Sequence, residues 1–509
     1  MKRSALQYWQ QLFVVQFLKT FRRPQRLFSI PPRLLWYKFI KPIARVIRAT
    51  TRASIMTVLA WFSGRLAARS NYYRAAILLQ QNHPDQAWPH FARALDFSEK
   101  PEEFFTAAVC LIQGLGRQHD GLALLHRSNE IKRKVATEHG VPYNEYRVLM
   151  DIWPSQLGHI AVADYVIKLG ILEGRPPDQT ILYAPPGAVV ANKFLLEQWK
   201  PHLRFVADKS DLPFSESIAR TQLFDFIGPS LSDGSTVYFW ELAAKTYKKW
   251  HAEGRAPLLK LPADIEERGR SALRSVGVPN DAWFVGLHVR EASSKSHHIG
   301  VHNVLNANLA DYGPAIDEIK KRGGWVIRMG DPSMTQLPDS EQVLDYCHSA
   351  IHSDWMDVFL CAKSRFFLGT SSGPAYIPPI YGVPCVLTNW WPPAQRPWHS
   401  QDIYIPKVYR GRTSRTYFSL SYSLTEPFGY CNAVDHLVRR HNVVVEDNDP
   451  EDIRLAVVEM FERLSGIAHY DDEVMRLRAQ IETTYDAKGA YGGALLARDF
   501  IKRNKILLD

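Results

Sequence analysis

The chain has 509 residues, 46% of them hydrophobic, and this length is too great for one core, so two or three globular domains are expected. The formal net charge of +10 is concentrated at one end, because the first 84 residues hold 15 Lys and Arg and no Asp or Glu. Five scattered cysteines in apolar surroundings predict buried thiols in a reducing cytosol and argue against disulfides or a zinc site.

Residues 1–70 form a basic amphipathic segment that mixes aromatic and aliphatic side chains with Lys and Arg. Its start lacks an apolar run followed by a cleavage site, so no secretory signal is expected. The longest uncharged apolar stretch nearby, Ala53–Gly64, is far shorter than the roughly 20 residues of a spanning helix. We predict peripheral attachment to the anionic inner face of a membrane and a cytoplasmic location. The alternatives are a solvated helix docked on the rest of the chain and, less favoured for want of any fold signature, nucleic-acid binding.

Residues 71–143 show apolar positions at helical spacing. Phe91 and Leu125 are separated by 34 residues, as are Asn82 and Gly116, and this is the tetratricopeptide period. The pattern predicts a helical, tetratricopeptide-like region, although two copies are fewer than the three or so units that usually share a stable core.

From residue 144 onward, strand-like apolar runs alternate with helical ones, which predicts α/β domains with parallel sheets. Residues 144–280 are assigned to an N-terminal Rossmann-like domain and residues 281–470 to a C-terminal one, followed by closing helices at 471–509. The expected strands lie at 146–153, 181–183, 203–207, 283–290, 325–329, 365–368, 383–387 and 443–445. The predicted fold is thus two facing Rossmann-like domains preceded by a helical region.

A small polar loop follows the strand expected at 365–368. Thr370, Ser371, Ser372 and Gly373 lie where this strand gives way to a helix. Backbone N–H groups and hydroxyls at such a turn bind phosphate or sugar oxygens, and glycine allows a close approach. A plain helix cap is the alternative interpretation.

Two other strand ends are expected to border the same crevice. Gly330 and Asp331 end the strand at 325–329, where Asp331 either accepts hydrogen bonds from a ribose or base or forms a turn. His288 and Arg290 project to one side of the strand at 283–290. A guanidinium at that edge suits a diphosphate, whereas a structural salt bridge for Arg290 and a core hydrogen bond for His288 are the alternatives.

The run from Phe284 to Trp391, especially HVRE, GGWVIRMGDP, SDWMDVFLCAKSRFFLGTSSGPAYIP and YGVPCVLTNWWPP, resembles a family of bacterial glycosyltransferases of the GT-B class. The HVR and TSSG elements are also similar to those of inverting fucosyltransferases, in which the corresponding arginine contacts the donor diphosphate. Glu291 directly after Arg290 departs from the fucosyltransferase pattern and leaves the sugar open. The resemblance implies GT-B architecture, a nucleotide-sugar donor in the C-terminal domain and an acceptor in the N-terminal one.

The resemblance also implies that no metal or other cofactor is required. The loops after the strands at 283–290, 325–329 and 365–368 contain no Asp-x-Asp pair. His297, His298 and His302 lie in a Ser-rich loop without acidic or Cys partners, which is more typical of a mobile lid than of a metal site.

Asp354 belongs to the donor pocket by the resemblance, whereas its position in a first helical turn alone would suit the helix dipole. Trp390 and Trp391 either stack on a base or sugar or pack between the domains.

Transfer with inversion needs a base for the acceptor hydroxyl. His159 follows Gly158 at a strand-to-helix turn, where GT-B enzymes place a base or an acceptor-binding group, although it could equally cap the helix. Glu291 is the rival base or else a salt-bridge partner of its neighbour, and Asp164 is expected to be an exposed helix residue.

The predicted function is transfer of a sugar from a nucleotide-diphosphate donor to a glycan, lipid-linked or protein acceptor. Inversion at the sugar carbon is what the resemblance implies. A nucleotide-sugar epimerase of the same architecture and a non-catalytic helical-repeat scaffold that binds nucleotide sugar or glycan are the alternatives. An oxidoreductase is disfavoured because no strand is followed by G-x-G-x-x-G.

Overall fold

A computed structural model describes residues 64–291 and 303–508. The first 63 residues of the predicted membrane-associating segment, and His297, His298 and His302, therefore lie outside the described residues. The chain divides into two compact units. Among the described residues the first unit comprises 64–131, Asn303 and 430–441, and the second comprises 132–291, 304–429 and 442–508.

The first unit is helical. Its elements are α4 (Gly64–Gln80), α5 (Pro84–Leu95), α6 (Pro101–Val109), the π-helical turn η3 (Cys110–Gly114), most of α7 (Gln118–Glu138) and α17 (Val434–His441). Ala75, Phe91, Ala107 and Cys110 form its core. The segment before α17 lies against η3, because the Asn432 N–H donates to the carbonyl of Gln113 at 2.8 Å.

The 34-residue spacing recurs in the structure of this unit. Asn82 follows α4 with φ 59°, and Gly116 follows η3 with φ 68°, so equivalent left-handed turns separate the helices of each pair. Phe91 and Leu125 are both fully buried. These features are compatible with a repeat, and the tetratricopeptide assignment stays a prediction.

The second unit is a mixed α/β structure with two parallel sheets. The smaller sheet has the order β1-β2-β3, formed by Arg147–Leu149, Thr180–Tyr183 and Arg204–Val206. Val148, Ile181 and Val206 form its core. The first strand is shorter than the predicted 146–153, because the chain turns at 151–155 and exposes Asp151 and Ile152. The helices that accompany this sheet are α8 (Leu157–Leu172), α9 (Lys193–Gln198), α10 (Glu216–Ala219) and α11 (Phe239–Ala252).

The larger sheet has seven strands in the order β12-β9-β8-β7-β4-β5-β6, all paired in parallel. Its strands are β4 (Phe284–His288), β5 (Trp325–Arg328), β6 (Val343–Asp345), β7 (Phe367–Gly369), β8 (Cys385–Trp390), β9 (Ile403–Pro406) and β12 (Leu495–Leu496). The chain proceeds outward from β4 through β5 to β6, and then from β7 on the other side of β4 through β8 to β9. The strand order therefore reverses between β4 and β7, which is where ligands bind in open α/β sheets.

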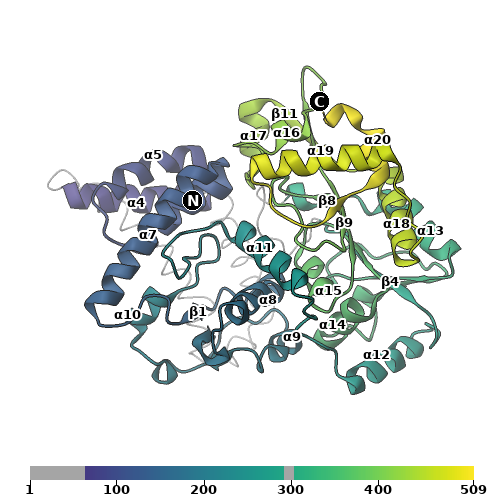
Figure 1. Ribbon diagram of the computed structural model, residues 1–509, viewed down its shortest axis with the longest axis horizontal. Coiled ribbons are helices and arrows are strands. Elements are labelled where there is room, and N and C mark those ends of the chain that lie inside the picture. The colour runs from purple at the N-terminus through teal and green to yellow at the C-terminus, as the bar shows by residue number, and fades with distance from the viewer. Residues whose placement is uncertain (1–63, 292–302, 509) are drawn as a thin grey trace, which may run out of the picture. The chain divides into compact units, whose positions relative to one another are not determined.

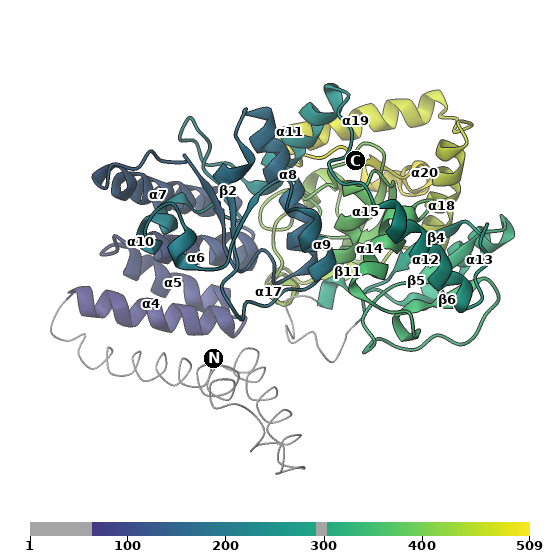
Figure 2. The same ribbon diagram turned by 90° about the horizontal axis from the view of Figure 1, so that it is seen from below.

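Helices cover both faces of the larger sheet. Figure 1 shows α13 and α18 on one side of β4 and α12, α14 and α15 on the other. The helices of this part are α12 (Ala263–Ser275), α13 (Gly313–Lys321), α14 (Asp354–Lys363), α15 (Ile377–Ile380), α16 (Leu420–Ser423), α18 (Pro450–Leu464), α19 (Asp472–Lys488) and α20 (Arg498–Arg503). Figure 2 shows α9 of the smaller sheet beside α14 of the larger one.

Two strands near the carboxyl end differ from expectation. The strand predicted at 443–445 is β11 (Val443–Glu446), which pairs antiparallel with β10 (Val408–Gly411) in a separate two-stranded sheet. The last strand of the main sheet is instead β12, inside the segment expected to be helical. A two-residue strand carries too little periodicity to be recognised in a sequence.

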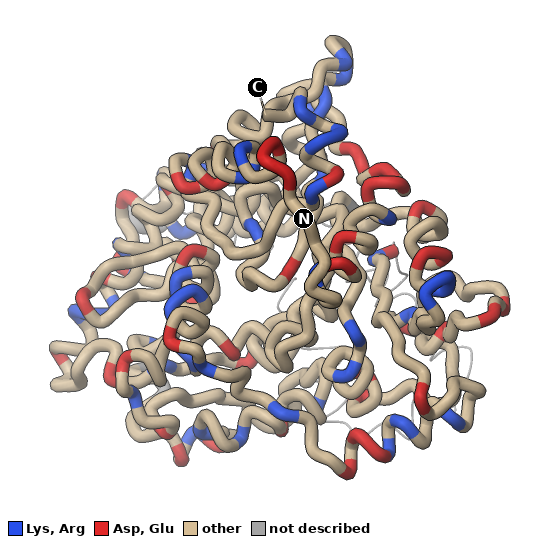
Figure 3. Tube along the Cα trace, turned by 45° about the vertical axis from the view of Figure 1, so that its right-hand side comes forward, with Lys and Arg blue, Asp and Glu red and all other residues tan. Residues whose placement is uncertain are grey.

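All five cysteines are buried and free, as predicted. Over residues 64–291 and 303–508 no helix has both the length and the apolarity that a membrane span requires. Figure 3 shows acidic and basic residues interspersed along the described trace. In the first 84 residues, by contrast, every charged Lys, Arg, Asp or Glu position is Lys or Arg.

Candidate functional site

The carboxyl ends of β4 and β7 are joined by hydrogen bonds at the point where the strand order reverses. The Thr370 N–H donates to the His288 carbonyl at 3.1 Å, and the Arg290 N–H donates to Thr370 Oγ1 at 3.1 Å. The loops that carry His288, Arg290 and Thr370 to Gly373 therefore meet at one edge, as the sequence predicts.

His288 is held as a neutral imidazole in this edge. Its Nδ1 lies 3.0 Å from Ser372 Oγ, and that hydroxyl donates to the Thr370 carbonyl at 3.1 Å. Because Ser372 has one hydroxyl proton, this arrangement makes Nδ1 of His288 the donor to Ser372. Burial, with the charges of Arg290 and Arg328 in addition, lowers the pKa of His288 to about 4.

Arg290 is a half-buried cation that has no counter-ion within residues 64–291 and 303–508. Burial lowers the pKa of its guanidinium, and no described residue hydrogen-bonds or ion-pairs with that group. The backbone N–H groups of Ser371, Ser372 and Gly373 likewise meet no backbone acceptor among the described residues. A desolvated cation and free N–H donors, carried by two loops that are hydrogen-bonded to each other, are the components of an anion site.

The hydroxyls of the polar loop are partly occupied by the protein. Thr370, Ser371 and Ser372 are all buried, and Ser371 Oγ accepts from the Trp391 N–H at 2.8 Å. Thr370 Oγ1 similarly accepts from the Arg290 N–H, and Ser372 Oγ contacts His288 and the Thr370 carbonyl, so all three hydroxyls hold the loop in place. Trp390 and Trp391 are almost fully buried, which favours packing over open stacking faces.

Gly330 and Asp331 follow β5, on the side of β4 opposite β7. Asp331 Oδ1 accepts from the Ser333 N–H at 2.9 Å, the hydrogen bond of an Asx turn. Gly330 has φ 156°, and a Cβ there would lie 2.2 Å from Met334 Sδ, so the turn requires glycine. Turn formation is thus the role that the contacts describe, and ligand binding by these residues stays a prediction.

Glu291 makes an ion pair, but its partner is Arg328 and not the neighbouring Arg290, so the predicted salt bridge between neighbours is wrong. Its Oε1 accepts from Arg328 Nη2 at 2.9 Å and its Oε2 from the Thr335 N–H at 3.0 Å. Arg328 also donates to Asp345 Oδ1 at 3.0 Å and is fully buried in β5. Sequence reasoning missed Arg328, although a charge inside an otherwise apolar strand was a usable signal.

Two groupings could suggest a metal ion. Asp345, Cys347 and His348 offer ligand atoms within 4.8 Å of one another, but Arg328 donates to the first two and already provides a cation there. The Asp-x-Asp sequence at 447–449 is engaged as well, because Asp447 pairs with Lys407 and Asp449 caps α18 through the Glu451 N–H.

Asp354 lies at the start of α14 and is exposed. Its Oδ2 accepts from the Lys193 N–H at 2.9 Å, and its carbonyl accepts from Asn192 Nδ2 at 2.8 Å. Asn192 caps α9, so these contacts join α9, which accompanies the smaller sheet, to α14, which covers the larger sheet. The assignment of Asp354 to a donor pocket stays a prediction.

His159 is half-buried in the first turn of α8. Its Nδ1 lies 3.1 Å from the Ile152 carbonyl, its ring lies 4.1 Å from that of Phe226, and burial lowers its pKa. A carbonyl can only accept, so Nδ1 carries the proton and Nε2 keeps its lone pair. The expectation that Asp164 is exposed is wrong: it is fully buried, because Lys168 lies 2.6 Å away on the same helix face.

The start of α8 approaches the polar loop through two glycines. A Cβ on Gly158 would lie 3.0 Å from Gly373 Cα, and a Cβ on Gly373 would lie 3.0 Å from the Gly158 nitrogen. Side chains at these two positions would therefore push the start of α8 away from the polar loop at 370–373. This contact places the loop after β1 next to the β4–β7 edge.

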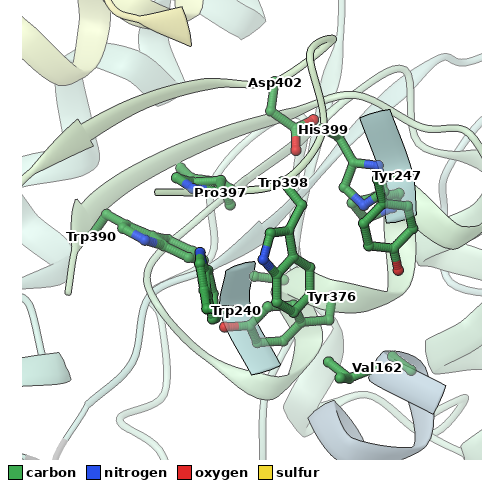
Figure 4. A pocket seen from close by; sticks show the side chains of 13 residues that line it. Val162, Trp240, Tyr247, Tyr376, Trp390, Pro397, Trp398, His399 and Asp402 are labelled. Carbon is green, nitrogen blue, oxygen red and sulfur yellow. The ribbon is translucent and has the colours of Figure 1, made fainter. Parts of the chain in front are cut away.

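An aromatic cluster includes Tyr376, which follows the polar loop at 370–373 in the chain. Figure 4 shows Trp398 with Trp240 and Tyr376 beside it, and ring centroids of Trp240 and Trp398 are 4.2 Å apart. The cavity that they line has a volume of about 10 Å³. This is the volume of about one water molecule, so the cluster is packing and not a substrate site.

Asp402 lies at the rim of this cluster with its carboxyl group buried. Its Oδ1 accepts from the Cys385 N–H at 2.8 Å, and burial raises its pKa from 3.8 to about 8. Between these values the folded state binds a proton that the unfolded state does not, so the free energy of unfolding falls as pH rises.

We expect Asp402→Asn to remove this contribution. Urea unfolding of both proteins from pH 5 to pH 8 should show the original protein losing stability relative to the variant as pH rises. Parallel stability curves across that range would contradict a protonated Asp402.

No family model matches the sequence, and no curated protein matches it significantly. A glycosyl transferase family 9 protein from Veillonella parvula DSM 2008 matches with 12% identity and a TM-score of 0.35, over 63% of this chain and 97% of that one. The bacterial iron-containing dodecameric glycosyltransferase TibC from enterotoxigenic E. coli H10407 matches with 14% identity and a TM-score of 0.27, over 48% and 57%.

The dodecameric iron-containing heptosyltransferase TibC in complex with ADP-D-beta-D-heptose matches with 12% identity and a TM-score of 0.29, over 48% of this chain and 58% of that one. Likeness at these TM-scores establishes no shared architecture. The function is therefore inferred from the residues of the crevice.

Proposed function

We propose that the protein is a metal-independent glycosyltransferase of GT-B type that transfers a sugar, with inversion, from a nucleotide-diphosphate donor to a glycan, lipid-linked or protein acceptor. The observation that carries the proposal is the unpaired guanidinium of Arg290 at the point where the strand order of a parallel sheet reverses. In this proposal residues 281–470 hold the donor and residues 144–280 face the acceptor.

The crevice suits a leaving diphosphate. Charge on the diphosphate grows as its bond to the sugar breaks, and a preorganised cation beside N–H donors stabilises that charge. Arg290 supplies the cation, and the N–H groups of Ser371, Ser372 and Gly373 supply donors. Because a guanidinium performs this role, no metal ion is invoked.

His159 is the better of the two predicted bases. Glu291 already accepts from Arg328 and from Thr335, whereas no described residue hydrogen-bonds to Nε2 of His159. The lowered pKa of His159 keeps its ring neutral and able to take the acceptor hydroxyl proton while that oxygen bonds to the sugar carbon and the diphosphate departs.

In this proposal the acceptor faces an exposed apolar loop. The loop after β2, residues 184–191, has no polar side chain, and Val189 is 68% exposed. The Ala191 N–H donates to the Pro154 carbonyl at 2.9 Å, which ties this loop to the one after β1, where Ile152 is 46% exposed. Such a rim favours an acceptor with an apolar portion, consistent with the membrane attachment proposed for residues 1–63.

Thermal-shift screening tests the donor class. The purified chain would be heated with ADP, GDP, CDP and UDP and with sugar derivatives of each, since a ligand at 100 times its dissociation constant stabilises by about 2.7 kcal/mol. We expect one nucleotide series to raise the midpoint and its sugar form to be hydrolysed slowly without acceptor. Absence of any shift, or conversion of the sugar to an epimer in place of hydrolysis or transfer, would refute the proposal.

A further inference from the structure

Arg290 and Glu291 are consecutive and oppositely charged, yet they do not pair. Glu291 is bound by Arg328, and the Arg290 guanidinium meets no carboxylate among the described residues. Their Cα atoms are only about 3.8 Å apart, so both side chains are long enough for the Glu291 carboxylate to reach the Arg290 guanidinium if the loop allowed it. The partners that Glu291 has elsewhere therefore bear on whether Arg290 stays available.

Arg328 occupies the position that can do so. It lies in β5, between β4 and β6, and is fully buried. Its Nη2 donates to Glu291, which follows the end of β4, and its Nη1 donates to Asp345 at the end of β6. One buried cation thus binds a carboxylate on each side of its own strand.

Each of these carboxylates is also held through its second oxygen. Glu291 Oε2 accepts from the Thr335 N–H at 3.0 Å, and Asp345 Oδ2 accepts from the Leu337 N–H at 2.9 Å. Both donors belong to the loop after β5. Glu291 is therefore fixed at two points, and its orientation is set by contacts on the side of the sheet away from β7.

We propose that Arg328 is a positioning residue that withholds Glu291 from Arg290 and so reserves Arg290 for an anionic ligand. The inference rests on the proposed diphosphate site. Without Arg328, Glu291 keeps only the Thr335 N–H and has the uncompensated charge of Arg290 as its nearest cation in sequence. A carboxylate bound there competes directly with phosphate oxygens for the same guanidinium.

Asp345 provides an internal comparison. It also loses a partner when Arg328 is changed, but it lies two strands away from β4, at about 4.8 Å a strand, and keeps contacts with Leu337 and His348. If nucleotide affinity falls because Asp345 loses its partner or because the loop after β5 loosens, changing Glu291 will not restore it. If affinity falls because the freed Glu291 carboxylate binds Arg290, changing Glu291 to Gln will restore it.

The test compares Arg328→Gln, Glu291→Gln and the double variant by calorimetric titration with ADP, GDP, CDP and UDP. For the nucleotide that binds the unmodified chain, we expect Arg328→Gln to weaken affinity about tenfold or more, Glu291→Gln to leave it within about threefold, and the double variant to recover to within about threefold. Unfolding midpoints of all proteins verify folding, and Arg328→Lys, which keeps the charge, is expected to lie between the original and Arg328→Gln.

Failure of the double variant to recover affinity would overturn the inference and leave Arg328 a purely structural residue. Weakening by Glu291→Gln alone, comparable to that of Arg328→Gln, would overturn it too. If no nucleotide binds the unmodified chain, the diphosphate site itself is refuted. If changing Arg290 abolishes nucleotide binding but Arg328→Gln has no effect on it, only the inference about Arg328 is refuted.

Discussion

Arg290→Ala is expected to weaken binding of the donor nucleotide, and to lower kcat/KM for transfer, by about 100-fold. Hydrogen bonds to a charged group contribute about 1.5–3 kcal/mol each, and a factor of ten corresponds to about 1.4 kcal/mol, so loss of a paired guanidinium–phosphate contact gives an effect of this size. Calorimetric titration and initial rates measure the two quantities. The free energy of unfolding should change little, because the side chain has no ion-pair partner in the described part of the chain.

Two controls sharpen the Arg290 experiment. Arg290→Lys keeps the charge but not the planar fork, so an intermediate loss of affinity is expected. Arg255→Ala removes an arginine that is paired with Glu253 at an exposed position of the same unit, and it should leave affinity unchanged. Unchanged affinity and turnover in Arg290→Ala would remove the basis of the proposed function.

Gly158→Val is expected to lower transfer at least about tenfold and to reduce stability by about 1–3 kcal/mol, the usual cost of overpacking. The added Cβ would lie 3.0 Å from Gly373 Cα, and backbone cannot move aside as a flexible side chain can. Displacement of Gly373 disturbs the N–H groups that face the diphosphate, so nucleotide affinity should fall with turnover. Steady-state rates and thermal unfolding measure both effects.

Gly170 on the same helix supplies the matched control for the Gly158 experiment. Its Cβ would meet Arg147 Nη1 at 3.5 Å, an ordinary contact, so Gly170→Ala should keep activity and gain up to about 1 kcal/mol from helix propensity. Gly158→Ala is expected to fall between Gly158→Val and the original chain. Equal activity of Gly158→Val and Gly170→Ala would show that the close approach is not required.

The strands that border the crevice could be predicted because their signal is local. Buried parallel strands appear as continuous apolar runs, and β4, β5, β7 and β8 all lie within one to three residues of the expected positions. The polar loop at 370–373 was recognisable from its composition. Short strands such as β6 and β9 were missed, since three or four residues beside Pro or Asp carry no clear pattern.

Local composition was less informative about caps and exposure. Ser353 stands at the N-cap of α14, where serine commonly caps a helix, but its hydroxyl donates to the Ile351 carbonyl instead. Asp164 was expected in solvent, but its helix is covered on both sides and Lys168 neutralises it. In both cases the deciding partner depends on geometry that spacing along the chain does not reveal.

The amino-acid sequence by itself determined where strands end and which polar residues follow them, because turns and buried strands depend on neighbours in the chain. Only the tertiary structure decided which charge meets which. Arg290 and Glu291 are adjacent in sequence, yet Glu291 pairs with Arg328, 37 residues away, because β4 and β5 lie side by side in the sheet. Ion pairing depends on distance across strands, and that distance exists only after the sheet has formed.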